Sequence, residues 1–211
     1  MSINNNPAQL RKHLKQLREQ QESMDTRRGA LLIRGRLFTW HATSRAALEE
    51  AGKPNRLQSV AAFWSLEQEP ELQPLLYQWV EEDGLSVSLP YINEETQLLE
   101  FRLWTPDTPM PVGPYGIPQP DGPAAPLPEV VLVPTLGFTR TGDRLGYGKG
   151  YYDRTLATLK EQGHHFVSIG IAWACGDLSD TNYQPASHDV TLDSVLTDKG
   201  WAVAAPTIEK L

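Results

Sequence analysis

Residues 130–172 read VVLVPTLGFTRTGDRLGYGKGYYDRTLATLKEQGHHFVSIGIA, and this stretch decides the expected fold. The mostly apolar segments 129–133 and 165–172 predict strands that are buried on both faces of a sheet. Between them, Tyr152 and Leu156 belong to an apolar series at helical spacing, which predicts a helix. A strand, a helix and a second strand form a βαβ unit, so part of the sheet should be parallel.

The rest of the chain predicts helices and strands on either side of this unit. The expected helices are 8–22, 26–51, 70–82 and 151–162, and the other expected strands are 59–64, 85–89, 98–104 and 194–197. Pro74 falls in or near the first turn of its helix, where proline is tolerated. These elements predict one α/β domain over residues 1–211, with an open, mostly parallel sheet flanked by helices.

Composition restricts the class of protein. The chain has 211 residues, of which 40% are hydrophobic, enough for one core. No run approaches the roughly 18 to 20 apolar residues of a membrane span, and residues 1–24 lack the apolar segment of a signal peptide. We therefore expect a cytoplasmic protein with no membrane partner. Cys175 is the single cysteine, which excludes an internal disulfide, and its apolar neighbours favour a core position over a nucleophile.

Charge is distributed unevenly along the chain. Residues 1–60 hold 11 Lys and Arg against 5 Asp and Glu, a balance of +6, so the remainder carries −13 to give the net charge of −7. The acidic total argues against a nucleic-acid partner. The basic N-terminal helices, within residues 1–56, have two interpretations: a solvated helix face, or contacts to a phosphate. The first helix has an apolar stripe of Leu10, Leu14 and Leu17, surrounded by Arg11, Lys12, Lys15 and Arg18.

A glycine-rich loop, residues 144–153, connects the first strand of the βαβ unit to its helix. Glycines at 146, 148 and 150 remove every second Cβ, so backbone amides can approach an anion and adopt left-handed conformations. Arg144 and Lys149 add positive charge, and the loop leads into a helix N-terminus, where anions bind. A tight strand-to-helix turn would explain the glycines alone. The charged residues favour a site for nucleotide phosphates.

Two better-known phosphate motifs do not fit this loop. A Walker A loop requires glycine five positions before the Gly-Lys pair and Ser or Thr after it, where this chain has Asp143 and Gly150. The dinucleotide fingerprint G-x-G-x-x-G requires its third glycine one residue later than Gly150. Neither motif therefore accounts for the loop, and the alternatives at this point are a strand-to-helix turn and a phosphate site of another kind.

Residues 132–154 closely resemble the signature of the 5-formyltetrahydrofolate cyclo-ligase family. Three more segments match in the family's order: 63–71 (FWSLEQEPE), 115–120 (YGIPQP) and the pair His188–Asp189. The resemblance covers residues 57 to 198 and implies a three-layer sandwich similar to phosphosugar isomerases and CoA transferases. It also implies ATP-dependent cyclisation of 5-formyltetrahydrofolate to 5,10-methenyltetrahydrofolate, with release of ADP and phosphate. In that reaction the formyl oxygen attacks the γ-phosphate, and N10 then closes onto the formyl carbon.

The resemblance implies a set of residues that bind ATP. They are Arg11, Lys12, Arg144, Gly146, Tyr147, Gly148, Lys149, Gly150, Tyr151 and Tyr152, and the expected catalytic residues among them are Arg144, Lys149 and Tyr152. Many family members carry a lysine where this chain has Pro7, so the N-terminal phosphate contact is expected to fall on Arg11 and Lys12. Tyr152 also has a simpler interpretation, because its spacing with Leu156 suits a core residue.

For the folate, the resemblance implies contacts from Phe63, Glu69, Tyr115 and Gly116. A carboxylate suits the row of N–H donors on a reduced pterin, although acidic residues before a helix, such as Glu69, are common for other reasons. Tyr115 lies in the segment 106–128, which holds nine of the 17 prolines and cannot form a regular strand or helix. This segment is either a linker or, as we favour, a stiffened wall of the substrate site.

Magnesium is the expected metal, held mainly by phosphate oxygens and water with one or two carboxylates. The resemblance places Asp153 and Asp189 at this site. Each has a simpler interpretation: Asp153 as a carboxylate favoured by the helix dipole, and Asp189 as an ordinary aspartate at a strand edge. If both serve only the metal, replacing them should barely change the stability of the ligand-free fold. His188 receives no role.

Two other functions remain open at this point. One is a non-catalytic sensor that binds a nucleotide or phosphosugar, since fold alone does not fix function. The other is an ATP-using enzyme acting on a related heterocycle. The paired carboxylates Asp153 and Asp189 argue against the first, and the pterin-side residues Phe63, Glu69 and Tyr115 argue moderately against the second. We expect a monomer whose partner is a small-molecule substrate.

Overall fold

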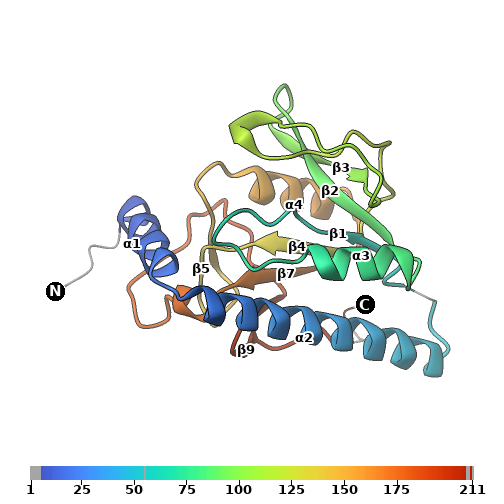
Figure 1. Ribbon diagram of the computed structural model, residues 1–211, viewed down its shortest axis with the longest axis horizontal. Coiled ribbons are helices and arrows are strands. Elements are labelled where there is room, and N and C mark those ends of the chain that lie inside the picture. Colours follow the sequence, from blue (N-terminus) through green and yellow to red (C-terminus); the bar gives the residue numbers. More distant parts are fainter. Residues whose placement is uncertain (1–5, 55, 208–209, 211) are drawn as a thin grey trace.

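The computed structural model describes residues 6–54, 56–207 and 210 (Figure 1). Within these residues, seven strands form one sheet in the order β3-β2-β1-β4-β7-β8-β9. The strands are β1 (Ser59–Ala61), β2 (Ser86–Asn93), β3 (Leu98–Leu103), β4 (Val130–Pro134), β7 (Val167–Ala172), β8 (Ser194–Thr197) and β9 (Gly200–Val203), and a separate hairpin pairs β5 (Gly137–Phe138) with β6 (Arg144–Leu145). The long helices are α1 (Pro7–Glu19), α2 (Ser23–Glu50), α3 (Gln73–Glu81) and α4 (Tyr151–Glu161).

The five central strands of the sheet are parallel, and only the edge strands β3 and β9 run antiparallel to their neighbours. β4 and β7 pair in parallel from Val130 opposite Val167 to Pro134 opposite Ile171, with α4 as their crossover. This confirms the predicted βαβ unit and the mostly parallel α/β sheet.

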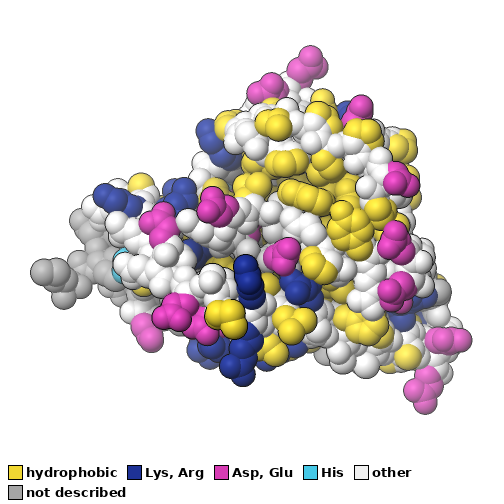
Figure 2. Space-filling view, viewed as in Figure 1, with side chains coloured by type: hydrophobic (Ala, Val, Ile, Leu, Met, Phe, Trp, Pro, Cys, Tyr) yellow, Lys and Arg dark blue, Asp and Glu magenta, His cyan; other side chains and the backbone are white. Residues whose placement is uncertain are grey.

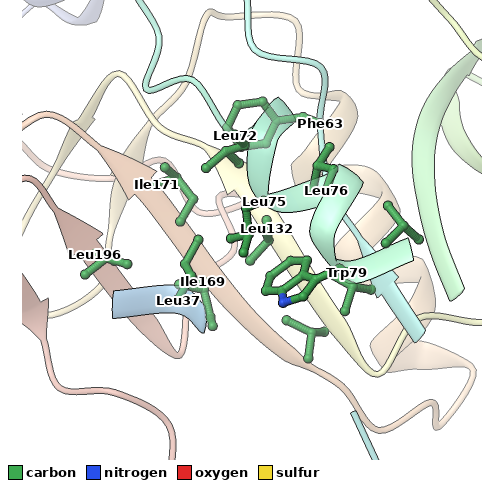
Figure 3. Packing of buried hydrophobic residues seen from close by; sticks show 14 of the residues in the cluster. Leu37, Phe63, Leu72, Leu75, Leu76, Trp79, Leu132, Ile169, Ile171 and Leu196 are labelled. Atoms are coloured by element: carbon green, nitrogen blue, oxygen red, sulfur yellow. The ribbon is translucent and has the colours of Figure 1, made fainter. Parts of the chain in front are cut away.

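Alternate residues of the buried strands face two different helix layers. Leu132 and Ile169 pack with α2 and α3, where Leu37 and Trp79 belong to the same fully buried cluster (Figure 3). Val131, Val133 and Val195 point to the opposite face and pack with Leu156 of α4. Because successive side chains of a strand alternate between faces, the all-apolar run in β4 supplies both cores. The result is the predicted three-layer arrangement, with the sheet between helices.

The structure differs from the sequence-based elements at the ends of β1 and β2 and in three strands that the sequence did not predict. β1 ends at Ala61 instead of residue 64, while β2 continues through Pro90 to Asn93. Pro90 is tolerated because it lies beyond the last residue that pairs with β1, so its missing N–H faces no parallel neighbour. β5, β6 and β9 were not predicted, since the two-residue strands are too short to show a period and β9 has no buried residue.

α1 packs away from the two main cores, on the β5–β6 hairpin. Leu10 and Leu14 are buried in a third cluster with Leu136 and Leu145. This contact holds the basic helix beside the loop that follows β6 (Figure 1). The proline-rich segment 106–128 contains only a short 3-10 turn, Pro114–Gly116, and isolated bridges, as expected for an irregular excursion. In the described part of the chain, no helix is both long and apolar enough to cross a membrane.

Candidate functional site

A large cavity of about 1450 Å³ opens at the carboxyl ends of the central strands. The chain leaves β1 toward β2 on one side and β4 toward β7 on the other, so the strand order reverses between β1 and β4. Phe63, which follows β1, and Pro134, at the end of β4, both line the cavity. Ligands of open α/β sheets bind at such a reversal point.

The cavity lies between surfaces of different character. In Figure 2, hydrophobic side chains cover the region where the 106–128 segment meets α3, whereas Lys and Arg side chains gather toward α1 and the start of α2. The lining has the same two parts, with Ile92, Leu99 and Ile117 on the apolar side and Arg11 and Lys15 on the basic side. An elongated ligand with an aromatic end and an anionic end would match this division.

The glycine-rich loop adopts the backbone predicted from its sequence. Gly148 has φ of 95° and Gly150 has φ of 70°, both in the left-handed region. Gly146 is needed for a different reason, since a Cβ there would lie 2.6 Å from Nη1 of Arg144. Gly150 is the N-cap of α4 and offers no side-chain cap, which leaves the first amides of the helix without such a partner. The loop thus presents a helix N-terminus to the cavity, an arrangement that favours anions.

Arg144 and Asp153 form a buried ion pair at the base of the loop. Nη2 of Arg144 lies 2.8 Å from Oδ2 of Asp153, and the two side chains are 5% and 13% exposed. The other oxygen of Asp153 accepts a hydrogen bond from the backbone N–H of Val190 at 3.2 Å. Arg144 therefore does not extend freely toward a ligand. Its charge is neutralised by the Asp153 carboxylate of α4. Through Val190, that carboxylate also holds the backbone next to Asp189.

Asp153 and Asp189 are brought to the same cavity wall. One oxygen of Asp189 accepts a hydrogen bond from the N–H of Ala186 at 2.8 Å, and the other lies 3.7 Å from Nε2 of the exposed His188. Among the residues described here, no three His, Cys, Asp or Glu side chains form a ready-made metal cluster. Two carboxylates beside a loop suited to phosphate still fit magnesium, because Mg²⁺ takes most of its ligands from phosphate and water.

Three basic side chains of α1 face the cavity at helical spacing. Nε of Arg11 donates to the carbonyl of Gly146 at 2.8 Å. Nζ of Lys15 lies 5.7 Å from the centre of the Tyr147 ring, and Arg18 completes the i, i+4, i+7 series. Lys12 is exposed and does not line the cavity, since one residue along a helix turns the side chain by about 100°. The expected pair Arg11 and Lys12 is thus separated by the structure, and Lys15 occupies the cavity side with Arg11.

Glu69 lies across the cavity from α1, on the segment after β1. Its Oε1 accepts a hydrogen bond from the Tyr147 hydroxyl at 2.6 Å, and its Oε2 accepts one from the N–H of Leu66 at 3.0 Å. Burial raises the pKa of the Glu69 carboxyl, and these hydrogen bonds, together with nearby Arg18, partly oppose the increase. Glu71 instead pairs with Arg34 of α2 at 3.4 Å. The acidic segment therefore directs one carboxylate to the cavity and another to structural support.

The two aromatic residues expected to contact folate, Phe63 and Tyr115, both line the cavity. Phe63 is buried at 4% exposure, whereas Tyr115 is 57% exposed and has φ of 61°, which is uncommon for a residue with a side chain. Nζ of Lys149 lies 4.6 Å from the centre of the Tyr115 ring. The Tyr115 hydroxyl lies 3.4 Å from that of Tyr151. Gly116 supports this turn with φ of 73° but does not itself line the cavity.

Tyr152 combines the two roles that its sequence position suggested. Its ring packs against both the Leu156 cluster and a smaller cluster with Tyr151. Its hydroxyl is buried and has no hydrogen-bond partner among the described residues, although the side chain lines the cavity. Burial, and then the charge of Glu69, raise the pKa of this hydroxyl. Tyr152 thus retains its proton and has an unused donor at the cavity wall.

Sequence reasoning missed several residues of the cavity. Arg18 is only 5% exposed, contrary to a solvated helix face, and its spacing with Leu10 and Leu14 at i, i+4, i+8 was the signal for burial. Gln119 is also buried, accepts a hydrogen bond from the N–H of Ile92, and has no partner for Nε2 in the described chain. Cys175 lies outside the cavity and is half-buried; burial raises the pKa of its thiol, which agrees with a non-nucleophilic role.

Comparisons with known proteins were made for the whole chain. The model of the 5-formyltetrahydrofolate cyclo-ligase family matches residues 3–198. A 5-formyltetrahydrofolate cyclo-ligase from Haemophilus influenzae is 31% identical over 147 residues, covering 66% of this chain and 75% of the relative. One from Mycolicibacterium smegmatis is 40% identical over 78 residues, covering 36% of this chain and 37% of the relative.

Solved structures agree with the fold. The 5,10-methenyltetrahydrofolate synthetase of Aquifex aeolicus superposes with a TM-score of 0.68 at 22% identity, covering 92% of this chain and 91% of that one. The corresponding protein from Mycoplasma pneumoniae gives a TM-score of 0.66 at 21% identity and covers 92% and 99%. At 21% and 22% identity, the two solved structures support the fold, whereas the family model and the sequence relatives show the family. This chain belongs to the 5-formyltetrahydrofolate cyclo-ligase family.

Proposed function

We propose that the protein is an enzyme, a ligase that uses ATP to cyclise 5-formyltetrahydrofolate to 5,10-methenyltetrahydrofolate, with release of ADP and phosphate. Family membership supports this proposal. The observation that carries it is that one cavity is lined both by the glycine-rich loop at the N-terminus of α4 and by the carboxylate of Glu69. The Tyr147–Glu69 hydrogen bond of 2.6 Å connects the two halves directly.

The reaction needs ATP because the formyl oxygen is a poor leaving group. The formyl oxygen attacks the γ-phosphorus, and the bond between that phosphorus and ADP breaks. N10 then adds to the activated formyl carbon and loses its proton, and the carbon–oxygen bond breaks to release phosphate. Phosphoryl transfer of this kind requires alignment of the reactants and neutralisation of charge, rather than a covalent protein nucleophile.

The basic half of the cavity supplies that neutralisation. Lys149 and the amides at the start of α4 line the cavity and would contact phosphate oxygens, and Arg11 and Lys15 add positive charge from α1. The role of Arg144 differs from the one expected from the sequence. Because its guanidinium is paired with Asp153, we propose that it supports the loop and orients that carboxylate.

The apolar half would bind the folate. Glu69 presents an acceptor to the N–H groups of the pterin, and Phe63 and Tyr115 provide ring surfaces. The unpaired hydroxyl of Tyr152 can donate a hydrogen bond to a substrate oxygen at the junction of the two halves. Magnesium, when bound with ATP, would offset the charge of the phosphates, and Asp153 and Asp189 are the carboxylates placed to hold it.

The test is turnover by the purified protein. With 5-formyltetrahydrofolate, ATP and magnesium, we expect the near-ultraviolet absorbance of the methenyl product to rise, with one ADP formed per product molecule. Binding of both compounds without product would favour a sensor function. ADP formation that requires a different heterocycle would favour the related ATP-using enzyme.

A further inference from the structure

Three residues from separate parts of the chain form a continuous line of hydrogen bonds across the cavity. Nη1 of Arg18, in α1, donates to the hydroxyl oxygen of Tyr147 at 2.9 Å. The Tyr147 hydroxyl donates to Oε1 of Glu69 at 2.6 Å. The line therefore begins in the N-terminal helix, passes through the glycine-rich loop and ends at the carboxylate on the segment after β1.

The direction of this line is fixed by the chemistry of its members. A guanidinium can only donate hydrogen bonds, so the Tyr147 oxygen must accept from Arg18. The single proton of the hydroxyl is then directed to Glu69, which as a carboxylate can only accept. Reversal would leave Arg18 facing a donor. Arg18 thus determines that Tyr147 presents its proton to Glu69.

Arg18 is itself held rigidly. Its Nη2 donates to the carbonyl of Thr135 at 2.7 Å and more weakly to that of Leu136 at 3.3 Å, both just beyond β4. The side chain is 5% exposed. In the described part of the chain, no carboxylate lies within ion-pair distance of Arg18. Its hydrogen-bonded link to Glu69 passes through the Tyr147 hydroxyl, and its charge also acts on Glu69 through space. Because Arg18 is buried and hydrogen-bonded at the end of β4, it holds the Tyr147 hydroxyl, and with it the loop, in a fixed position.

Tyr147 is placed to respond to a nucleotide. It lies between Gly146 and Gly148, and its neighbours in the loop are the residues proposed to contact phosphate. The carbonyl of Gly146 is also held by Arg11 at 2.8 Å. A phosphate bound to the amides of this loop would fix the backbone on both sides of Tyr147, and with it the position of the Tyr147 side chain. Ordering of Tyr147 would then order Glu69, before or after the folate arrives.

We propose that Arg18 is a positioning residue and that the line Arg18–Tyr147–Glu69 couples nucleotide binding at the loop to pterin binding at Glu69. This inference rests on the proposed function, since it assumes that the two ligands share the cavity. It adds that each ligand raises the affinity for the other. By thermodynamic reciprocity, the two factors must be equal.

Calorimetric titration measures this coupling without turnover. The dissociation constant of 5-formyltetrahydrofolate is measured alone and with a saturating non-hydrolysable ATP analogue and magnesium, and the reverse titration checks reciprocity. We expect the analogue to tighten folate binding by about five- to a hundredfold in the unmodified protein. Tyr147→Phe removes only the hydroxyl and should reduce that factor to near one. Tyr77→Phe removes an exposed hydroxyl outside the cavity and should leave the factor unchanged.

Arg18→Met is the second variant, since it removes the residue that orients Tyr147 and should also abolish the coupling. Tyr147→Phe keeps the coupling measurable if Arg18→Met does not fold, because it leaves the anchor of Arg18 intact. A purely structural role would weaken both ligands equally and preserve the factor, which would overturn the proposal. A factor of one in the unmodified protein would overturn it too, while leaving the proposed function in place. Absence of 5-formyltetrahydrofolate binding under all conditions would instead reject the proposed function, and this inference with it.

Discussion

Replacement of Asp153 by Asn is expected to destabilise the ligand-free protein substantially. The sequence suggested that both proposed metal carboxylates could be replaced with little effect on the fold. The structure changes this expectation for Asp153 alone, because its carboxylate is the counter-charge of the buried Arg144 at 2.8 Å. Among the described residues, the polar partners of the Asp189 carboxylate are a backbone N–H of its own loop and an exposed histidine.

The size of the effect follows from burial. Removing one member of a buried ion pair costs about 3 to 5 kcal/mol, because the remaining charge stays buried without a partner. Asn keeps one acceptor for Arg144, so we expect the lower end, about 3 kcal/mol. For a chain of this length, that corresponds to a decrease in Tm of about 6 to 12 °C. Asp189→Asn retains its acceptor oxygen and should cost less than about 1 kcal/mol.

Thermal unfolding monitored by circular dichroism, without ATP or magnesium, measures both variants under the same conditions. A double-mutant cycle isolates the pair: in an Arg144→Met background, Asp153→Asn should cost much less than in the unmodified protein. If Asp153→Asn melts within about 2 °C of the unmodified protein, well below the shift expected, the ion pair contributes little. Asp153 would then be free to serve the metal alone, as the sequence suggested.

Four further changes test the rest of the site. Lys149→Ala should lower kcat/KM for ATP by about ten- to a hundredfold through loss of one charge-assisted contact. Lys160→Ala, at the far end of α4, should leave kcat/KM unchanged. Unchanged ATP kinetics in Lys149→Ala would remove Lys149 from the phosphate site. Glu69→Gln should raise KM for 5-formyltetrahydrofolate while calorimetric ATP affinity stays constant, with Glu71→Gln as control; equal weakening of both ligands would indicate a damaged fold. Burial raises the pKa of Glu69, so its ionised form is lost, as pH falls, at a higher pH than for an ordinary glutamate. The affinity for 5-formyltetrahydrofolate should decline in that pH range. The same dependence of folate affinity on pH in Glu69→Gln would contradict this assignment. Asp189→Asn should raise the magnesium concentration needed for turnover, and an unchanged requirement would make Asp189 structural.

The centre of the fold could be predicted because its local signals agree. The run in β4 is apolar at every position, and the helix after it has a clear 3.6-residue period, so the βαβ unit leaves few alternatives. The edge strand β9 and the separate β5–β6 hairpin could not be predicted in this way, although the other edge strand, β3, was predicted. β9 is half-buried throughout, and β5 and β6 are held by packing against α1 rather than by their own sequences.

In the site, too, features set by residues close in sequence could be predicted, whereas contacts between distant segments could not. The left-handed glycines 148 and 150 follow from residue type alone, and the family resemblance indicated Glu69. The pairing of Arg144 with Asp153 depends on how β6 and α4 meet, which no local pattern records. For the basic helix that carries Arg18, the sequence left two interpretations, a solvated face or contacts to a phosphate, and charged residues are usually exposed. The helical position of Arg18 beside Leu14 predicted burial more accurately than its charge did.

The central claim is that the formyl oxygen is phosphorylated inside this cavity. It is tested most directly by supplying 5-formyltetrahydrofolate labelled with ¹⁸O in the formyl group, together with unlabelled ATP and water. Mass spectrometry of the released phosphate should then find the label in that phosphate, in proportion to the methenyl product formed. Unlabelled phosphate released alongside methenyl product would mean that water, rather than the formyl oxygen, accepts the phosphoryl group, and would contradict the proposed chemistry.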